Sequence, residues 1–138
     1  KIEGFFEYVV PPLEGFWLRS GAHKSAFRWI SVIRLPDFVT RVDFDWAVET
    51  AARKKNLDCS AAELLTVDEG LCVQMMHLGS YDDEPGSVAQ MDTYLLQNGY
   101  ENDLRGDRLH HEIYLSDPRK TTPEKRKTVI RHPIKRAE

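Results

Sequence analysis

The order of the secondary-structure elements expected after Leu71 constrains the fold more than any other feature of this sequence. Apolar and β-branched runs separated by turn residues predict a strand, a helix and two more strands, at 71–78, about 83–98, 110–116 and 127–132. Pro85 suits the first turn of the helix, Asn98-Gly99 suits its end, and Pro133 would end the last strand. A strand-helix-strand-strand unit pairs its strands largely antiparallel and leaves one face of the sheet for the helix. The sequence therefore predicts an α+β fold and not a doubly wound parallel sheet.

The residues before that unit predict more strands and a further helix. Aromatic and β-branched runs indicate strands at 5–10, 13–19, 27–35 and 62–67. Thr40 is a good N-cap for a helix at about 41–55, and Asp43 adds an acidic residue to its first turn. Apolar residues recur along this helix at positions 44, 47, 48 and 51, which lie on one face. We expect these elements to pack against the strand-helix-strand-strand unit.

Composition and charge argue against several classes of protein. A chain of 138 residues, 41% hydrophobic and 30% charged, suits one globular domain, and its net charge of -3 gives no general reason to expect nucleic-acid binding. Residues 119–138 are basic, but Val129-Ile130 and two prolines favour a strand with solvated flanks over a nucleic-acid arm. Cys59 and Cys72 form neither a disulfide framework nor a zinc site. No apolar run approaches the roughly 20 residues of a membrane helix, and no signal peptide is visible. We expect a cytoplasmic protein that does not associate with membranes.

Five segments, in order along nearly the whole chain, resemble the gyrase-inhibitor-like (GyrI-like) family. They are 8–15 (YVVPPLEG), 33–39 (IRLPDFV), 69–74 (EGLCVQ), 77–85 (HLGSYDDEP) and 110–119 (HHEIYLSDPR). Family members usually have His-x-Gly-Pro-Tyr in the fourth segment, where this chain has Ser80 in place of the proline. The resemblance implies a single small-molecule-binding domain over 1–138, built from two strand-helix-strand-strand modules around a central ligand cleft.

The resemblance also implies how the chain divides between the two modules. Residues 59–138 would form a complete second module, and residues 1–58 the remainder of the first module with a connecting helix. The first module would lack its opening strand and helix. Because the sequence starts without Met and directly in an apolar run, we expect a further portion before Lys1. Family members include drug-sensing domains of transcription regulators, gyrase-inhibitory proteins and hydrolases of cyclopropane-bearing genotoxins. The first and last segments look most like the stand-alone hydrolase-type subgroup.

Glu112 is the strongest single candidate for chemistry. Strand alternation places His110, Glu112 and Tyr114 on one face and His111 and Ile113 on the other. We expect the second set to face the helices and the first to face the cleft, which would bring a carboxylate and a phenol together. A carboxylate in an apolar cleft attracts a cationic ligand or, if its pKa is raised, acts as a general base on water. From the residues alone, an exposed Glu on an ordinary sheet face is an equally good interpretation, and the resemblance favours the pocket.

Aromatic residues and a second carboxylate complete the expected site. Tyr8, Trp17 and Trp29 lie on expected strands, where they would hold a flat ligand by stacking and burial. For any one of them, packing in the core is the better interpretation, because aromatic side chains usually lie inside. Glu14 precedes Gly15 and follows two prolines, and the family pattern makes it a second candidate carboxylate. A solvated turn residue is an equally good interpretation of Glu14.

No motif indicates a metal or a cofactor. His110 and His111 are neighbours on a strand and point to opposite faces, so they cannot chelate one ion together. No catalytic-triad order, phosphate loop or dinucleotide fingerprint is present. We interpret His77 and Tyr81, near the start of the second helix, as structural residues.

The sequence and the resemblance together predict a protein that binds a small aromatic or cationic molecule, with hydrolysis of an electrophilic aromatic toxin as its activity. In that reaction Trp17 and Trp29 would hold the ligand, and Glu112 would activate water. Tyr114 would hydrogen-bond the carbonyl oxygen on which charge develops. The other residues expected to contact the ligand are Tyr8, Glu14 and His110. The alternative is a non-catalytic protein that sequesters drugs or acts on a partner such as DNA gyrase, and neither hypothesis involves direct nucleic-acid binding.

Overall fold

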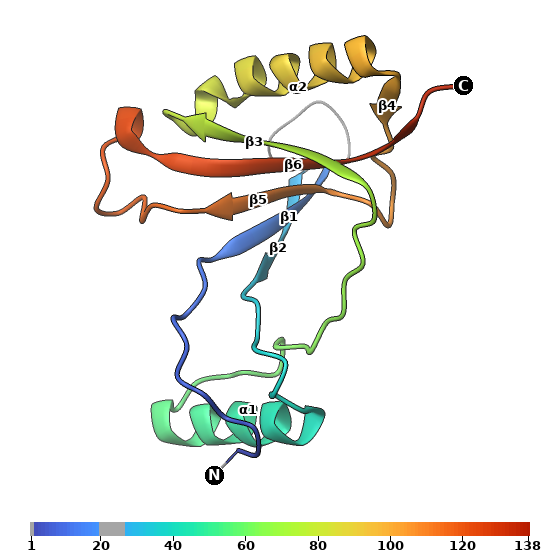
Figure 1. Cartoon of the computed structure of the whole chain (residues 1–138). Coiled ribbons are helices and arrows are strands. Elements are labelled where there is room, and N and C mark those ends of the chain that lie inside the picture. The colour runs from blue at the N-terminus through green and yellow to red at the C-terminus, as the bar shows by residue number, and fades with distance from the viewer. Residues whose placement is uncertain (1, 20–26) are drawn as a thin grey trace. The chain divides into compact units, whose positions relative to one another are not determined.

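The computed structural model of the chain describes residues 2–19 and 27–138 (Figure 1). The elements in chain order are β1 (Glu14–Arg19), β2 (Phe27–Val32), α1 (Arg41–Lys55), β3 (Cys72–Leu78), η2 (Tyr81–Asp83), α2 (Glu84–Asn98), β4 (Tyr100–Asn102), β5 (His110–Tyr114), η3 (Pro123–Lys125) and β6 (Lys127–Arg136). They fall into two compact units. The first contains the residues up to Pro11 together with 34–68, and the second contains the described residues of 12–33 together with 69–138.

The second unit is an antiparallel sheet with α2 against it. The strand order is β2-β1-β5-β6-β3, and β4 pairs with the C-terminal end of β6. Every pairing between neighbouring strands is antiparallel. Helix α2 lies along the part of the sheet formed by β3 and β6 (Figure 1). The predicted α+β fold is confirmed, and so is the strand-helix-strand-strand order after Leu71.

The core of this unit lies between α2 and the strands beneath it. Met91 and Leu95 on α2 are each 2% exposed, and Ile130 at the centre of β6 is fully buried. His77 fixes the start of the helix to β3, because its Nδ1 lies 2.7 Å from Ser87 Oγ and its Nε2 lies 2.7 Å from the Ser80 carbonyl oxygen. The N-terminal turn of α2 is therefore held at a defined position over the sheet.

The first unit contains α1, whose ends follow the predicted signals. Thr40 and Asp43 form a capping box, in which each side chain hydrogen-bonds to the backbone of the other. Asn56 ends the helix in the left-handed conformation, with a φ of 50°. None of the residues of α1 is fully buried: on its apolar stripe Phe44 and Val48 are partly covered, and Ala47 and Ala51 are exposed.

Two of the predicted strands are absent. Residues 5–10 and 62–67 are described and form no strand. In the first of these segments the rings of Phe5, Phe6 and Tyr8 pack edge-on against Phe38, at centroid distances of 5.4, 5.1 and 5.8 Å. In residues 5–10 the aromatic side chains therefore pack within the first unit, while Val9 and Val10 are exposed and no strand pairing occurs.

The last strand continues through the proline that was predicted to end it. β5 pairs with β6 only as far as Arg131, so no pairing with β5 needs an N–H at position 133. The Pro133 carbonyl accepts a hydrogen bond from the Asp103 N–H at 2.9 Å, and the Ile134 N–H donates to the Leu71 carbonyl at 3.0 Å. This extension also provides the partner for β4, which was not predicted. None of the helices in the described residues is both long and apolar enough to cross a membrane.

The packing of α2 makes a direct prediction about two adjacent leucines. Leu95 is 2% exposed and Leu96 is 83% exposed. Replacing each of them by alanine removes the same atoms from a buried and from an exposed position, so the difference between the two variants measures the effect of burial. We expect Leu95→Ala to lower the free energy of unfolding by about 2–5 kcal/mol, and Leu96→Ala to change it by about 0.5 kcal/mol or less. Urea unfolding followed by circular dichroism measures both. Equal effects of the two substitutions would contradict the placement of α2.

Candidate functional site

Glu112 lies at the centre of the candidate site, on the middle of β5. Its side chain is nearly buried, at 7% residue exposure. The Tyr114 hydroxyl donates a hydrogen bond to Glu112 Oε2 at 2.7 Å, and His110 Nε2 lies 2.8 Å from Glu112 Oε1. The three alternate residues of β5 therefore share one face, as strand periodicity predicted. They form one hydrogen-bonded group around a carboxylate.

This group faces α2, which corrects the expected orientation of β5. Glu112 is paired with Ile130 across the sheet, and Ile130 lies in the core under α2. Glu84, in the first turn of α2, has a carboxyl oxygen within 4.8 Å of ligand atoms on both His110 and Glu112. The expectation that the other face of β5 would meet the helices was wrong for α2. Alternation fixes which residues share a face, but it carries no information on which face a helix will cover.

Two tryptophans extend the site along β1 and β2. Trp17 Nε1 donates to the Tyr114 hydroxyl oxygen at 3.1 Å, which joins β1 to the group around Glu112. The Trp17 and Trp29 rings stack at 5.9 Å, and Trp29 meets the Tyr114 ring edge-on at 6.5 Å. Trp29 is 44% exposed, so it is not a core residue of the described structure. An accessible aromatic surface therefore lies next to the buried carboxylate.

Gly15 allows Trp29 to occupy this position. It is paired with Glu112 on one side and with Ser31 on the other, in the middle of a continuous three-strand ladder. A Cβ atom added at Gly15 would overlap the Trp29 indole ring. The glycine in this strand therefore provides space for an aromatic ring from the neighbouring strand.

Tyr81 adds a fourth ring that the sequence interpretation had treated as structural. It lies in η2, just before α2, and its ring meets the Tyr114 ring edge-on at 6.1 Å. The Arg126 guanidinium lies over the Tyr81 ring, 5.0 Å from its centroid. The segment that leads into α2 therefore contributes an aromatic side chain as well as Glu84.

His132 on β6 extends the hydrogen-bonded group away from the aromatic surface. Its Nε2 lies 2.6 Å from His110 Nδ1, so His110 connects His132 to Glu112. Burial and the neighbouring His110 lower the pKa of His132 to about 4, so it is neutral at physiological pH. Its Nδ1 is buried and has no hydrogen-bond partner in the described structure. Nothing in the local sequence indicated this residue, because only the pairing of β5 with β6 brings it close.

Glu84 and Glu112 have pKa values that are displaced in opposite directions. Burial raises the pKa of Glu84 to about 9, and a hydrogen bond to Glu112 and the charge of Glu112 act in the same direction. Burial would also raise the pKa of Glu112, but hydrogen bonds from His110, Glu84 and Tyr114 outweigh it and lower the pKa to about 2. The pair therefore shares one proton near neutral pH. The raised pKa required by the general-base hypothesis occurs at Glu84 and not at Glu112.

Glu14 belongs to a different group, on the opposite face of the sheet. It lies beside His111, whose Nε2 is 2.7 Å from Glu14 Oε1 and whose Nδ1 is 2.7 Å from Glu69 Oε1. His111 also stacks on Phe16 at 4.2 Å, and Arg131 pairs with Glu69 at 2.7 Å. These contacts join β1, β5, β6 and the residues before β3. Glu14 is therefore not brought together with Glu112.

Tyr8 lies in the first unit, where its ring packs against Phe38. The residues that the second unit does bring together from the predicted set are Trp17, Trp29, His110, Glu112 and Tyr114. Sequence reasoning missed Glu84, Tyr81 and His132. An acidic residue in the first turn of a helix has an ordinary role next to the helix dipole, so Glu84 carried no distinctive signal.

The donor atoms of Glu84, His110 and Glu112 come close enough to be considered as metal ligands, within 4.8 Å of one another. Their own hydrogen bonds give a different interpretation. His110 already has a polar partner at each ring nitrogen, and Glu112 has one at each carboxylate oxygen. A metal would have to replace several of these contacts. We interpret the group as an acid–base cluster.

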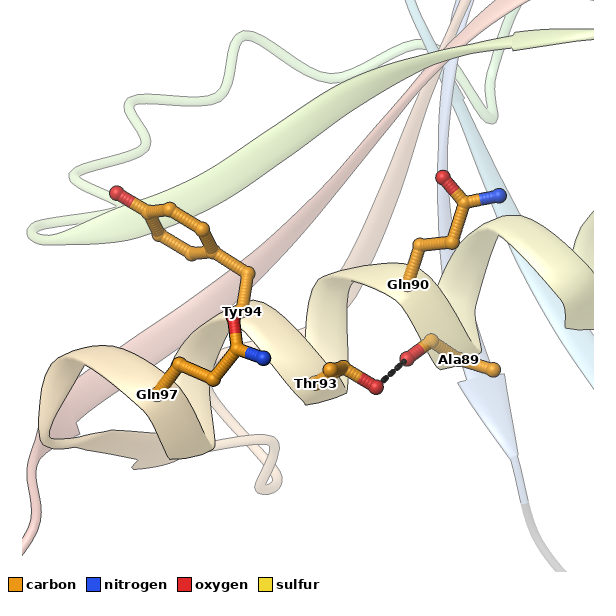
Figure 2. Close-up of a pocket in the computed structure, with 5 residues that line it drawn as sticks. All are labelled: Ala89, Gln90, Thr93, Tyr94 and Gln97. Atoms are coloured by element: carbon orange, nitrogen blue, oxygen red, sulfur yellow. Dashed lines mark hydrogen bonds between the residues drawn. The ribbon is translucent and has the colours of Figure 1, made fainter.

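Two hollows in the surface lie elsewhere in the second unit. One, of about 310 Å³, is lined by five residues of α2 alone, as Figure 2 shows: Ala89, Gln90, Thr93, Tyr94 and Gln97. The other, of about 520 Å³, lies between α2 and the edge strand β3, and its lining includes Leu71, Val73, Met91 and Ile134. Neither hollow is lined by an acidic or basic side chain. Neither therefore offers the acid–base chemistry of the group around Glu112.

Comparison with solved structures gives close matches over almost the whole chain. An uncharacterized conserved protein from Listeria innocua is 46% identical with a TM-score of 0.92, and covers 98% of this chain and 69% of its own. A hydrolase from Listeria innocua is 45% identical with a TM-score of 0.90, and covers 98% and 68%. No match was found among curated proteins. The GyrI-like small molecule binding domain matches residues 28–135, and with this match and these neighbours the chain belongs to the GyrI-like family of small-molecule-binding domains.

Proposed function

We propose that this protein binds a small planar molecule against the aromatic surface and hydrolyses electrophilic members of that class. The observation that carries the proposal is the buried carboxylate of Glu112, which contacts Tyr114 and His110 through hydrogen bonds and lies beside a group of aromatic rings that includes the exposed Trp29. Membership of a small-molecule-binding family supports the binding step. A similar protein from Listeria innocua is described as a hydrolase, which supports the second step. Cyclopropane-bearing genotoxins are the substrate class that the family resemblance suggests.

The aromatic residues suit a flat ligand. Trp29 makes ring contacts with Trp17 and Tyr114, and Tyr81, just before α2, meets the Tyr114 ring edge-on. Ring contacts contribute about 0.5–1.5 kcal/mol each beyond the burial of apolar area. Because Glu112 is ionised, a cationic ligand gains an additional attraction at this site.

The low pKa of Glu112 restricts the reaction that it can assist. A carboxylate with a pKa of about 2 is a weak base toward free water. When water bonds to a strained, electrophilic carbon, however, it becomes a protonated alcohol, which is a much stronger acid than a carboxylic acid. Glu112 can accept the proton from that species late in the reaction. Ring strain in a cyclopropane supplies the driving force for the preceding bond formation.

Tyr114 is placed to support Glu112 more than to contact a substrate carbonyl. Its single O–H donates to Glu112, and its oxygen accepts from Trp17. Burial and the neighbouring Glu112 raise the pKa of Tyr114 well above its ordinary value, so it keeps this proton. The proposed role of Tyr114 is therefore to hold Glu112 ionised and oriented. The sequence had led us to expect that Tyr114 would hydrogen-bond the carbonyl oxygen of the substrate. If Tyr114 instead supports Glu112, another group has to donate a hydrogen bond to that carbonyl oxygen.

The first prediction of this proposal concerns the position of the Trp29 ring. In Gly15→Ala the added methyl group would displace the ring from the strand, and its contacts with Trp17 and Tyr114 would be weakened. We expect affinity for a planar acridine dye to fall by about 2- to 10-fold, the equivalent of one ring contact. Gly106→Ala is a matched control, because a Cβ there meets nothing within 4 Å. Fluorescence titration measures both, and equal affinities in the two variants would argue against Trp29 as a ligand contact.

A second prediction concerns the hydrogen bond from Tyr114. In Tyr114→Phe the carboxylate of Glu112 loses a donor at 2.7 Å, so its pKa should rise from about 2 toward its ordinary value of 4.5. The ¹³C chemical shift of the Glu112 carboxyl carbon, followed by NMR from pH 2 to 7, reports this change. An unaltered titration would show that Tyr114 does not stabilise the charge.

A third prediction tests the proposed reaction through Glu112. Glu112→Gln keeps the shape of the side chain but removes the proton acceptor. Turnover of a spiro-cyclopropane conjugated to a carbonyl group should fall by roughly 10²–10⁴-fold, the usual contribution of a positioned general base. Affinity for a neutral aromatic ligand should change little, because stacking and burial carry that binding. Steady-state hydrolysis and ligand titration on the full-length protein measure the two quantities.

The control for this experiment is Glu101→Gln, on the exposed strand β4. The alternative of a non-catalytic drug-binding or gyrase-modulating protein predicts different results. It predicts no turnover by the unmodified protein, and a loss of affinity in Glu112→Gln that is confined to cationic ligands. Turnover that survives in Glu112→Gln would remove Glu112 from the mechanism, and Glu14 could not replace it because Glu14 lies beside His111 on the opposite face of the sheet.

A further inference from the structure

The outer edge of β3 is a free strand edge in the described part of the chain. β3 pairs with β6 on one side, and the described structure places no strand on its other side. The Leu71 carbonyl and the Gly79 N–H both bond to β6. Because the backbone groups of an antiparallel strand point alternately to its two sides, those of the even-numbered residues from 72 to 78 point outward. They are available to pair with a further strand.

This edge lacks the features that normally protect a free strand. Proteins usually place charged residues, prolines or bulges at such an edge, because an unprotected one pairs with other chains. The segment 71–78 contains no Asp, Glu, Lys, Arg or Pro. Its register with β6 is continuous from Cys72 to Leu78, so it has no bulge. The strand is therefore suited to pairing and is not protected against it.

The surface that continues from this edge onto α2 is also free of charge. The hollow of about 520 Å³ has Val73 and Met75 on its strand side, and Gln90 and Tyr94 on its helix side. The last two residues project from the same side of α2 and also line the smaller hollow (Figure 2). Neither hollow is lined by an acidic or basic side chain, in a chain that is 30% charged. The strand edge and this flank of α2 therefore form one continuous uncharged surface.

Apolar side chains are exposed on both faces of β3 at this surface. Leu71 and Tyr94 are each more than half exposed, at 54% and 55%. His77 contacts α2, so alternation directs Met76 and Leu78 to the opposite face, where both are exposed. A partner strand beside β3 would cover apolar side chains above and below the sheet as well as satisfy the backbone groups of the edge.

We propose that the outer edge of β3 and the adjoining flank of α2 form the interface between two copies of this protein, related by a twofold axis perpendicular to the sheet. Such an interface brings the same residues together from both copies, so a charged residue near the axis would repel its own equivalent. The lack of charge removes that repulsion and favours a second copy over a charged partner. The rotation also places the two β3 strands antiparallel, as every other pair in the sheet is.

This arrangement joins the two sheets into one and brings both α2 helices to the same face. Tyr94 and Gln90 of each copy then approach those of the other across the axis and close the hollow beside β3. The aromatic residues Trp17 and Trp29 lie on β1 and β2, at the other end of the strand order. The interface involves neither of them, and its existence does not depend on the proposed hydrolysis.

Sedimentation equilibrium of the full-length protein tests the interface. We expect a dimer at micromolar concentrations. Met76→Lys adds a charge at an exposed position of the edge and brings two ammonium groups close to the axis. The dissociation constant of the dimer should therefore rise by about 10-fold or more. Leu96→Lys is the matched control, because Leu96 is an exposed apolar residue of α2 that lines neither hollow, and it should dimerise as the unmodified protein does.

Amide hydrogen exchange of the unmodified protein, followed by NMR, locates the contact without any substitution. The outward N–H groups of Gln74 and Met76 should exchange more slowly at high protein concentration than at low concentration. The inward N–H groups of Val73 and Met75 face β6 and should exchange slowly at both concentrations.

Each outcome decides for or against the interface. A full-length monomer at all concentrations overturns it, and so does a dimer that Met76→Lys leaves intact, because that dimer uses another surface. Outward N–H groups that are protected equally at every concentration would show that a segment of the same chain covers the edge, which also overturns it. A dimer weakened by Met76→Lys and not by Leu96→Lys, with concentration-dependent protection of Gln74 and Met76, supports it.

Discussion

The site depends on the burial of one negative charge at Glu112. An isolated carboxylate in such surroundings would take up a proton, because burial strongly disfavours the charged form. Here the Tyr114 hydroxyl and His110 compensate that cost, and each is held by a further partner, Trp17 and His132 respectively. The five residues come from β1, β5 and β6. The sheet therefore has to be in register across these three strands before the charge can be accommodated.

The same constraint explains why a second carboxyl group is tolerated beside the first. Two ionised carboxylates in contact would repel each other strongly in a buried site. A single proton shared between them removes that repulsion, and the unequal supply of donors places it on Glu84. Packing of α2, through the His77 contacts with Ser87 and Ser80, sets how closely Glu84 approaches. The packing of α2 therefore brings the Glu84 carboxyl group close to Glu112 and His110.

The sequence predicted those parts of the site that depend on local periodicity. Alternation along β5 correctly grouped Glu112 with its two neighbours on the same face, and helix signals located α2 to within a residue or two. The sequence did not predict which face of the sheet α2 covers. Alternation divides the residues of a strand between two faces, but it does not identify the face that a helix will cover. Glu84 and His132 were missed for a related reason. Each has an ordinary local role, and only contacts between elements distant in sequence bring them to Glu112.

Pro133 and Gly15 show why residue propensities alone did not predict the strands fully. Proline usually ends a strand because it lacks a donor, but β5 no longer pairs with β6 at position 133. Glycine usually weakens a strand, yet at position 15 its missing side chain provides the space that Trp29 fills. In both cases the deciding factor is what lies on the neighbouring strand. Propensity scales describe one residue at a time and carry no such information.

The low pKa of Glu112 also restricts the substrates that the proposed reaction can accept. A base with a pKa of about 2 gives little help in removing a proton from free water, so substrates that need hydroxide-like attack, such as amides, are poor candidates. A strained electrophile differs, because bond formation itself makes the attacking water acidic. The aromatic surface favours flat conjugated molecules, and these are the molecules in which ring opening can place the electron pair on a phenolate oxygen. Binding and chemistry therefore select for the same structural property of the substrate.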